Sequence, residues 1–199
     1  MKLGPEKRHL GLSNKALFSI IVGFLMVSSV LGYVFIGRSD STEQYDYNGF
    51  KFDRTGSGLQ TEVDGMVVYF DSLPQQAEGI AVDSAAVDKI RNTRMFYITS
   101  NSTSKSKEAI AKSGFDISKA VALKGVYAQA AFIDPTKYSI PVVSCSNATP
   151  FVPVLTFDRA NETSVRAEGN CIFIGAPSDS EFIRAKDALL YRFLGILTN

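Results

Sequence analysis

Two overlapping Ser-x-x-Lys motifs are the residues of this chain whose types and spacing most resemble a catalytic pattern. Ser102 is followed by Lys105, and Ser104 is followed by Lys107. In penicillin-binding enzymes such a serine is the nucleophile, and its lysine lies one helical turn further on. The accompanying Ser-Asp-Asn and Lys-Thr-Gly elements are missing, and four-residue matches arise easily in a serine- and lysine-rich loop. The sequence therefore favours a solvated helix start over a catalytic pair.

A second pair of reactive residues, Glu62 and Asp64, lies in a segment with strand character. Residues two apart on a strand share a face, so the two carboxylates can act together. They could bind Ca²⁺, or perform hydrolysis with a third carboxylate. An exposed strand face beside a turn gives the same pattern without any chemistry, and the sequence favours this second interpretation.

Histidine is the residue whose distribution excludes most chemistry. The single histidine is His9, close to the N-terminus, so residues 38–199 contain none. Ser-His-Asp and Cys-His nucleophile systems are excluded there, as is histidine-ligated zinc, and two cysteines cannot build a structural zinc site. General acid–base chemistry would fall to carboxylates, lysine or tyrosine. These absences favour a function other than catalysis, and we expect no metal and no cofactor.

Cys145 and Cys171 are the only cysteines, and three Asn-x-Ser/Thr sequons begin at Asn101, Asn147 and Asn161. An even pair of cysteines in an oxidising compartment predicts one disulfide, the alternative being two buried free thiols. The sequons are candidate N-glycosylation sites if the source organism glycosylates its proteins. Both features predict that the C-terminal part of the chain is extracytoplasmic.

Residues 16–37 form an uncharged, mostly apolar run that predicts one transmembrane helix. Twenty-two residues at about 1.5 Å each give roughly 33 Å, enough for a hydrocarbon core of about 30 Å. Lys2, Lys7, Arg8 and Lys15 precede this run, and Arg38 alone follows it closely. Lys and Arg favour the cytoplasmic side, so we expect a single-pass protein of the cell membrane with a cytoplasmic N-terminus. Residues 16–37 would then contact membrane lipid.

The alternative to this signal-anchor is a cleaved secretory signal peptide, whose apolar core usually has only 7–15 residues. The uncleaved anchor divides the chain into a cytoplasmic tail (1–15), a transmembrane helix (16–37), a linker (38–44) and an extracytoplasmic domain (45–199). With 21 basic and 20 acidic residues the net charge is +1, so no nucleic-acid partner is expected.

The extracytoplasmic domain begins with strand patterns. Alternating side chains and turn signals predict a three-stranded antiparallel meander over 47–55, 59–63 and 66–70. A helix over 84–92 and a core strand over 94–100 follow. Further helices are predicted over 104–113, closed by Gly114, and over 116–132.

The last third of the domain predicts strands over 141–145, 153–157 and 165–174. A capping box from Ser178 to Glu181 then precedes an amphipathic helix that continues to residue 194. We therefore expect an α+β or α/β domain with a mixed sheet, an N-terminal β-meander and a C-terminal amphipathic helix. The disulfide would join the strand 141–145 to the strand 165–174.

Four segments carry a resemblance to a known group of proteins. They are 47–52 (Tyr-Asn-Gly-Phe-Lys-Phe), 141–149 (Pro-Val-Val-Ser-Cys-Ser-Asn-Ala-Thr), 169–172 (Gly-Asn-Cys-Ile) and 184–196 (Arg-Ala-Lys-Asp-Ala-Leu-Leu-Tyr-Arg-Phe-Leu-Gly-Ile). Together they resemble small single-anchor archaeal envelope proteins of unknown function. The resemblance implies an archaeal source and an extracytoplasmic domain, and it brings no catalytic residues.

Three classes of function agree with these observations. The leading hypothesis is a membrane-anchored binding or structural domain, an accessory component of a cell-envelope assembly that contacts another envelope protein. The first alternative is a carboxylate-dependent envelope hydrolase. The second is a ligand-sensing ectodomain, against which the tail of about 15 residues counts, because it is too short for an output domain.

The disulfide gives the first testable prediction. Replacing Cys145 or Cys171 with Ser should lower the free energy of unfolding by about 3–4 kcal/mol, because the crosslink restricts the unfolded chain. Thermal melting with and without a reductant measures this, and the reductant should have little effect on either variant. An unchanged melting temperature in the variants would contradict the disulfide.

Overall fold

The computed structural model describes residues 14–36, 43–56 and 58–198, and divides the chain into residues 1–42 and 43–199. In the first unit, helix α1 (Asn14–Ile36) has 23 residues. Among the described residues, no helix combines the length and apolar character that crossing a membrane requires. The expected span 16–37 extends past residue 28, the last in α1 whose side chain is described, and so stays a prediction. The expected tail and linker lie largely outside the described residues.

The second unit begins with a four-stranded antiparallel meander in the order β1-β2-β3-β4. Its strands are β1 (Gln44–Tyr47), β2 (Phe50–Thr55), β3 (Gly58–Val63) and β4 (Met66–Phe70). Asn48-Gly49 and Asp64-Gly65 form tight turns in which every residue has a positive φ, a conformation that favours Asn, Asp and Gly. The expected meander had three strands. The fourth, β1, arises because the Asn48-Gly49 turn divides 44–55 and brings Gln44 into the sheet.

A six-stranded mixed sheet follows, in the order β5-β9-β10-β8-β6-β7. Its strands are β5 (Ala81–Val82), β6 (Met95–Ser100), β7 (Tyr127–Phe132), β8 (Val154–Arg159), β9 (Ser164–Glu168) and β10 (Cys171–Ala176). Strands β7, β6, β8 and β10 are parallel, while β9 is antiparallel to β10. The domain is thus a mixed α/β fold with the expected meander and mixed sheet.

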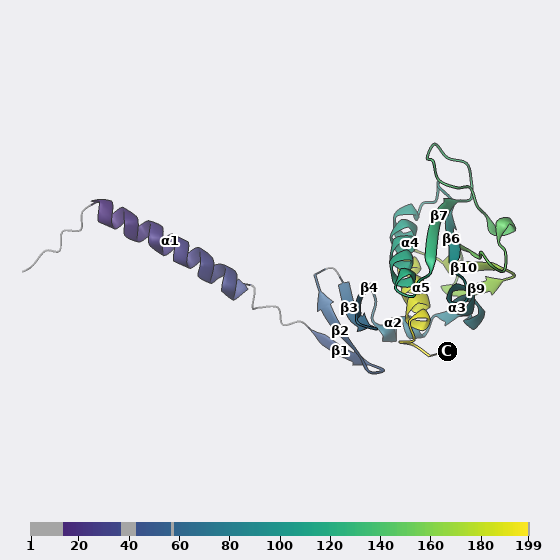
Figure 1. Ribbon diagram of the computed structural model, residues 1–199, viewed down its shortest axis with the longest axis horizontal. Coiled ribbons are helices and arrows are strands. Elements are labelled where there is room, and N and C mark those ends of the chain that lie inside the picture. Colours follow the sequence, from purple (N-terminus) through teal and green to yellow (C-terminus); the bar gives the residue numbers. More distant parts are fainter. Residues whose placement is uncertain (1–13, 37–42, 57, 199) are drawn as a thin grey trace, which may run out of the picture. The chain divides into compact units, whose positions relative to one another are not determined.

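Four helices accompany the strands within the described part of residues 43–199: α2 (Pro74–Glu78), α3 (Ser84–Arg91), α4 (Lys107–Ala122) and α5 (Asp179–Phe193). Helix α4 connects the parallel strands β6 and β7. Figure 1 shows α4 next to β6 and β7, and α4 also contacts α5, which packs against β10. A short 3₁₀ helix, η1 (Cys145–Asn147), lies in the long connection between β7 and β8.

The C-terminal helix α5 is the central element of the core. Its N-cap is Ser178, whose Oγ accepts a hydrogen bond from Glu181 N at 3.3 Å, as the sequence predicts. Aromatic contacts join the helix to the meander: the Tyr191 ring stacks on Phe70 with centroids 4.1 Å apart and meets Phe52 edge-on at 5.9 Å. All three rings are buried. The meander therefore packs on the same helix that contacts the mixed sheet.

The prediction of two helices over 104–113 and 116–132 is wrong. A single helix, α4, continues through Gly114, and 127–132 is the strand β7. At position 114 a Cβ atom would lie 3.3 Å from Cγ2 of Ile98, so the glycine allows close contact between helix and sheet. Gly125, with φ of 74°, lies in the turn between α4 and the strand.

Two strand predictions also differ from the structure. The segment 165–174 is not one strand, because Gly169 has a positive φ in a turn that separates β9 from β10. The segment 141–145 forms only one parallel bridge, between Val142 and Phe132, before η1 begins. The disulfide Cys145–Cys171 is confirmed, and it joins η1 to β10.

The packing of α5 gives the second testable prediction. The Tyr191 hydroxyl donates a buried hydrogen bond to the carbonyl of Ser72. Tyr191→Phe keeps the ring contacts but leaves that carbonyl without this donor, so the free energy of unfolding should fall by about 1–2 kcal/mol. The control is Tyr97→Phe, since the Tyr97 hydroxyl has no hydrogen-bond partner among the described residues. Equal stability of the two variants in chemical denaturation would contradict this role.

Candidate functional site: a groove between α4 and β7

A groove of about 600 Å³ runs between helix α4 and strand β7, and we call it the α4–β7 groove. This volume lies within the range of small-molecule and peptide sites. The side chains that form its two long walls are mainly apolar: Ile110, Ala111 and Phe115 of α4, and Ala128, Ala130 and Phe132 of β7. The groove is therefore suited to apolar groups.

The groove exists because the residues on its β7 wall are small. Side chains alternate along a strand, so Ala128 and Ala130 both face α4, where valine or isoleucine is usual under a helix. On α4 itself, Ala111 and Gly114 add little volume opposite them. Ile98 of the neighbouring strand β6 lies at the bottom. The space is thus determined by the lack of large side chains, not by any one residue.

Polar residues gather at one end of the groove, where β6 ends and α4 begins. Ser100, Asn101 and Ser102 line this end together with Lys107 and Glu108 in the first turn of α4. Neither Lys107 nor Glu108 forms an ion pair with another described residue. In open α/β sheets, ligands bind next to the carboxyl ends of the parallel strands, and this end of the groove has that location.

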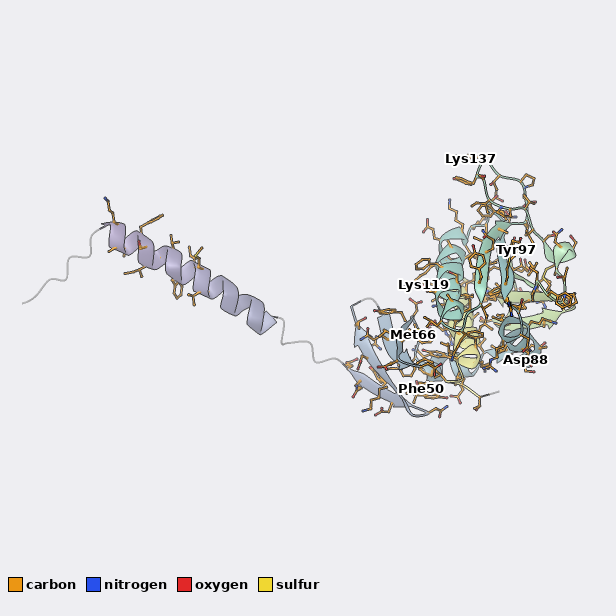
Figure 2. All side chains as sticks on the ribbon, in the orientation of Figure 1. Phe50, Met66, Asp88, Tyr97, Lys119 and Lys137 are labelled. Atoms are coloured by element: carbon orange, nitrogen blue, oxygen red, sulfur yellow. A yellow bond between two sulfur atoms is a disulfide. The ribbon has the colours of Figure 1, made fainter. Side chains whose placement is uncertain are left out.

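The rim of the groove includes an exposed aromatic residue, Phe115, whose side chain is 62% exposed. Lys119, labelled on α4 in Figure 2, lies one turn further along the helix, and its ammonium group is 5.4 Å from the centre of the Phe115 ring. The same ammonium group is 6.0 Å from the Tyr69 ring. The Lys119 ammonium group thus lies within cation–π distance of one ring on α4 and one ring on β4.

Strand β7 is the outer strand of the sheet, and part of its outer edge is open. Tyr127 N donates to Arg94 O, so the odd-numbered residues direct their backbone groups toward β6 and the even-numbered ones direct theirs outward. On this outer edge, the Phe132 N–H donates to Pro141 O at 2.9 Å, and the Phe132 carbonyl accepts from Val143 N at 2.8 Å. Pairing on the outer edge is therefore confined to the end of the strand.

Further back along this edge, the N–H groups of Ala128 and Ala130 have no hydrogen-bond partner among the described residues. The Ala130 carbonyl accepts only a long bond of 3.3 Å, from the Gln129 side chain. Because Ala128 and Ala130 also line the groove, the open backbone edge and the apolar wall belong to the same residues. This combination carried no clear signal in the sequence.

The Ser-x-x-Lys motifs are not arranged for catalysis. Ser102 and Ser104 lie in the loop before α4, which begins only at Lys107. The Ser104 hydroxyl accepts from Ser106 N at 3.2 Å, and the Ser104 carbonyl accepts from Lys107 N at 3.3 Å. Within the described residues, no hydrogen bond joins either serine hydroxyl to the side chain of Lys105 or Lys107. The structure therefore agrees with a helix start.

Glu62 and Asp64 are both exposed near the β3–β4 turn, where Asp64 forms an ion pair with Lys124. No group of three or more acidic, cysteine or histidine side chains suited to a metal occurs in the described part of the chain. The pair thus has the arrangement of a solvated turn.

The three sequons all lie on the surface of residues 43–199, since Asn101, Asn147 and Asn161 are exposed. Asn101 Oδ1 accepts hydrogen bonds from Thr103, and Asn147 Oδ1 accepts one from Ser144 N at 2.9 Å. Asn101 lies at the polar end of the groove. Their glycosylation stays a prediction.

A buried group of charged residues is the second chemical feature, and the sequence reasoning missed it. Lys186 of α5 is completely buried, and its Nζ lies 2.6 Å from Asp187 Oδ1, 2.7 Å from Asp71 Oδ2 and 3.1 Å from Asp116 Oδ2. Lys112 of α4 also contacts Asp71 and Asp116, at 2.5 and 2.9 Å. We call these five residues the lysine–aspartate cluster.

Electrostatics make the buried lysine of this cluster, Lys186, unsuited to nucleophilic chemistry. Burial lowers the pKa of Lys186, but Asp187 and the other carboxylates outweigh burial, and the pKa is raised above its ordinary value. Burial raises the pKa of Asp71, yet the two lysines outweigh this and hold it below its ordinary value. A lysine that stays protonated cannot attack a substrate, so Lys186 is suited to holding the surrounding carboxylates in place by ion pairs.

Comparisons with known proteins add no assignment to either feature. No family model matches the chain, and searches of curated proteins and of solved structures found no significant similarity. The resemblance to archaeal envelope proteins stays an expectation from the sequence.

The third testable prediction concerns the lysine–aspartate cluster. Lys186→Met leaves Asp187 buried without its cation and should lower the free energy of unfolding by about 3–5 kcal/mol. Lys112→Met is the control, because the Lys112 side chain is 47% exposed and its loss should cost about 1 kcal/mol or less. Denaturant titration of both variants measures the difference.

The same titration at several pH values gives a second readout. The lowered pKa of Asp71 means that its ion pairs stabilise the protein above its unfolded pKa of about 3.9 and lose that effect as the pH falls through the folded value. If Lys186→Met were no more destabilising than Lys112→Met, the structural role of the cluster would be wrong.

Proposed function

We propose that residues 43–199 form a binding domain outside the cytoplasm, tethered to the cell membrane through residues 16–37. In this proposal the α4–β7 groove binds another protein of the cell envelope, and the chain is an accessory component of a larger assembly. The observation that carries the proposal is the groove itself, which is apolar, of binding-site volume and without a catalytic set of side chains.

The anchoring part of the proposal rests mainly on sequence. The uncharged run, the excess of Lys and Arg before it and the oxidised cysteine pair after it agree with a cytoplasmic N-terminus and an external domain. In α1, the apolar side chains of Phe18, Phe24 and Met26 are each at least 69% exposed, and lipid would cover such side chains.

The hydrolase alternative has less support. A carboxylate-dependent hydrolase needs two free carboxyl groups with different pKa values around a cleft. In the lysine–aspartate cluster the carboxylates are paired with lysines, and Asp187 is fully buried. The polar end of the groove contributes a single acidic residue, Glu108.

For the sensor alternative, no observation of the groove favours signalling over binding.

Crosslinking in intact membranes is the experiment that tests the proposal, with Ala130→Phe as the groove-filling variant. A phenylalanine is well suited to a strand and projects into the groove, so the domain should stay folded while the partner is excluded. We expect the wild-type chain to be captured in an assembly larger than itself, and the variant to lose at least tenfold of the crosslinked partner.

Ala122→Phe is the matched control, because Ala122 is an exposed alanine of α4 that does not line the groove. It should retain the crosslinked partner at the wild-type level. A wild-type chain that is a lone monomer in the membrane would refute the accessory role. Equal capture of the partner by Ala130→Phe and by the wild-type chain would show that the partner does not bind in the groove.

A further inference from the structure

We infer that the α4–β7 groove takes an extended, uncharged peptide segment of the partner protein, which adds to β7 as the next strand of the sheet. This inference rests on the proposed function and specifies the chemistry of its ligand. Strand addition to an exposed sheet edge is a common mode of peptide recognition, in which backbone hydrogen bonds supply affinity and side-chain pockets supply specificity.

The open hydrogen-bonding edge is the first step of the argument. The chain already adds one residue, Val142, to the outer edge of β7 at Phe132, in parallel orientation. Continuing this pairing would require residue 141 to donate its N–H to the Ala130 carbonyl. Residue 141 is proline, which has no N–H, so the chain cannot extend its own pairing along the edge.

The outward groups of Ala128 and Ala130 are consequently left for a strand from another molecule. Such a strand would continue the row of hydrogen bonds that Val142 begins. A helix or a lipid chain in the groove would leave these backbone N–H groups without a partner, because neither has free backbone carbonyls at strand spacing.

The walls of the groove determine which side chains the added strand would carry. Every second residue of that strand would face α4, about 6.4–6.8 Å apart, and would enter the space next to Ala128 and Ala130. No charged residue lines the groove beyond Lys107 and Glu108 at its polar end, so a charged side chain deeper inside would lack a counter-ion. Alternating aliphatic residues such as Val, Ile or Ala have complementary shape and charge.

Two isomeric pools of N-methylated peptides test the inference on the full-length protein in detergent micelles. The parent pool contains fluorescein-labelled seven-residue peptides with Ala, Val, Ile or Leu at positions 2, 4 and 6 and Ser or Thr at the others. One derived pool is N-methylated at positions 2, 4 and 6, and the other at positions 3, 5 and 7. Methylation removes the donor on one edge of the added strand and leaves the other edge intact.

We expect the parent pool and one methylated pool to bind, and the other methylated pool to bind at least tenfold more weakly. The pool that fails also gives the direction of the added strand. The residues that face α4, at positions 2, 4 and 6, donate their N–H groups to β7 only in an antiparallel pair, so failure of the pool methylated there indicates an antiparallel strand. Failure of the pool methylated at positions 3, 5 and 7 indicates a parallel strand. Failure of the parent pool, or equal behaviour of the two methylated pools, would overturn strand addition.

A variant of β7 supplies an independent readout. Ala130→Pro removes an outward N–H from an edge strand, where proline is tolerated, and should weaken binding of the parent pool at least tenfold. Its melting curve checks that it is folded; if it is not, the methylated pools carry the test alone. Wild-type affinity in the folded variant would overturn the inference.

The failures of the two proposals are distinguishable. Loss of the envelope partner in Ala130→Phe, with no difference between the methylated pools, would leave the groove as the binding site but refute the strand. Competition of the parent pool by phospholipid vesicles, or self-association that Ala130→Pro abolishes, would identify lipid or a second copy as the occupant in place of a peptide.

Discussion

The burial of Lys186 is the constraint on which the other parts of this domain depend. Its ammonium group contacts carboxylates from three separate places in the chain: Asp71 after β4, Asp116 in α4, and its neighbour Asp187 in α5. A buried lysine is unfavourable unless all of these partners are in position. The meander, α4 and α5 must therefore assemble in one arrangement, because sliding any of them would leave a buried charge unpaired.

Asp187 adds backbone contacts to this constraint. Its Oδ2 accepts hydrogen bonds from the N–H groups of Asp71 and Ser72, at 3.0 and 2.7 Å, and the Tyr191 hydroxyl donates to the Ser72 carbonyl one turn further along α5. The end of β4 is thus held on α5 by both charge and hydrogen bonds. Helix α4, fixed on this side through Lys112 and Asp116, presents its other side to β7 and determines the width of the groove. One face of α4 thus forms the ion pairs of the lysine–aspartate cluster, and the other face lines the groove.

The sequence predicted those features of the fold that depend on local chemistry. Ser178 caps a helix through its own hydroxyl, Asp64-Gly65 forms a hairpin turn by its backbone preference, and Cys145 pairs with Cys171 because the chain has no other cysteine. The errors came where tertiary structure overrides local preference. Residues 127–132, Tyr-Ala-Gln-Ala-Ala-Phe, have the helix propensity of their alanines, yet they form a strand because β6 supplies hydrogen bonds along one edge.

The candidate site was missed for the same reason. Ala128 and Ala130 are unusually small for a strand that lies under a helix, and their small size produces the groove. Predictions from sequence assume that each residue follows the usual preference of its element, so they fail where residues such as these depart from it. Lys186 and Asp187 were missed because an amphipathic pattern treats charged residues as solvated. Only the three-dimensional positions of Asp71 and Asp116, far away in the sequence, show that they are buried and paired.

The disulfide has a consequence for the edge of the sheet at β7. Residues 142–145 cross the face of the sheet away from α4: Val142 is bridged to β7, the Val143 carbonyl accepts from Thr99 of β6 at 2.7 Å, and Cys145 is bonded to Cys171 of β10. Strands β6 and β8 lie between β7 and β10. The covalent bond to the interior strand β10 thus fixes the short segment that closes the end of the edge strand β7. In mechanical terms, a force on β10 would be transmitted through this segment to β7, and reduction of the disulfide would remove that covalent route.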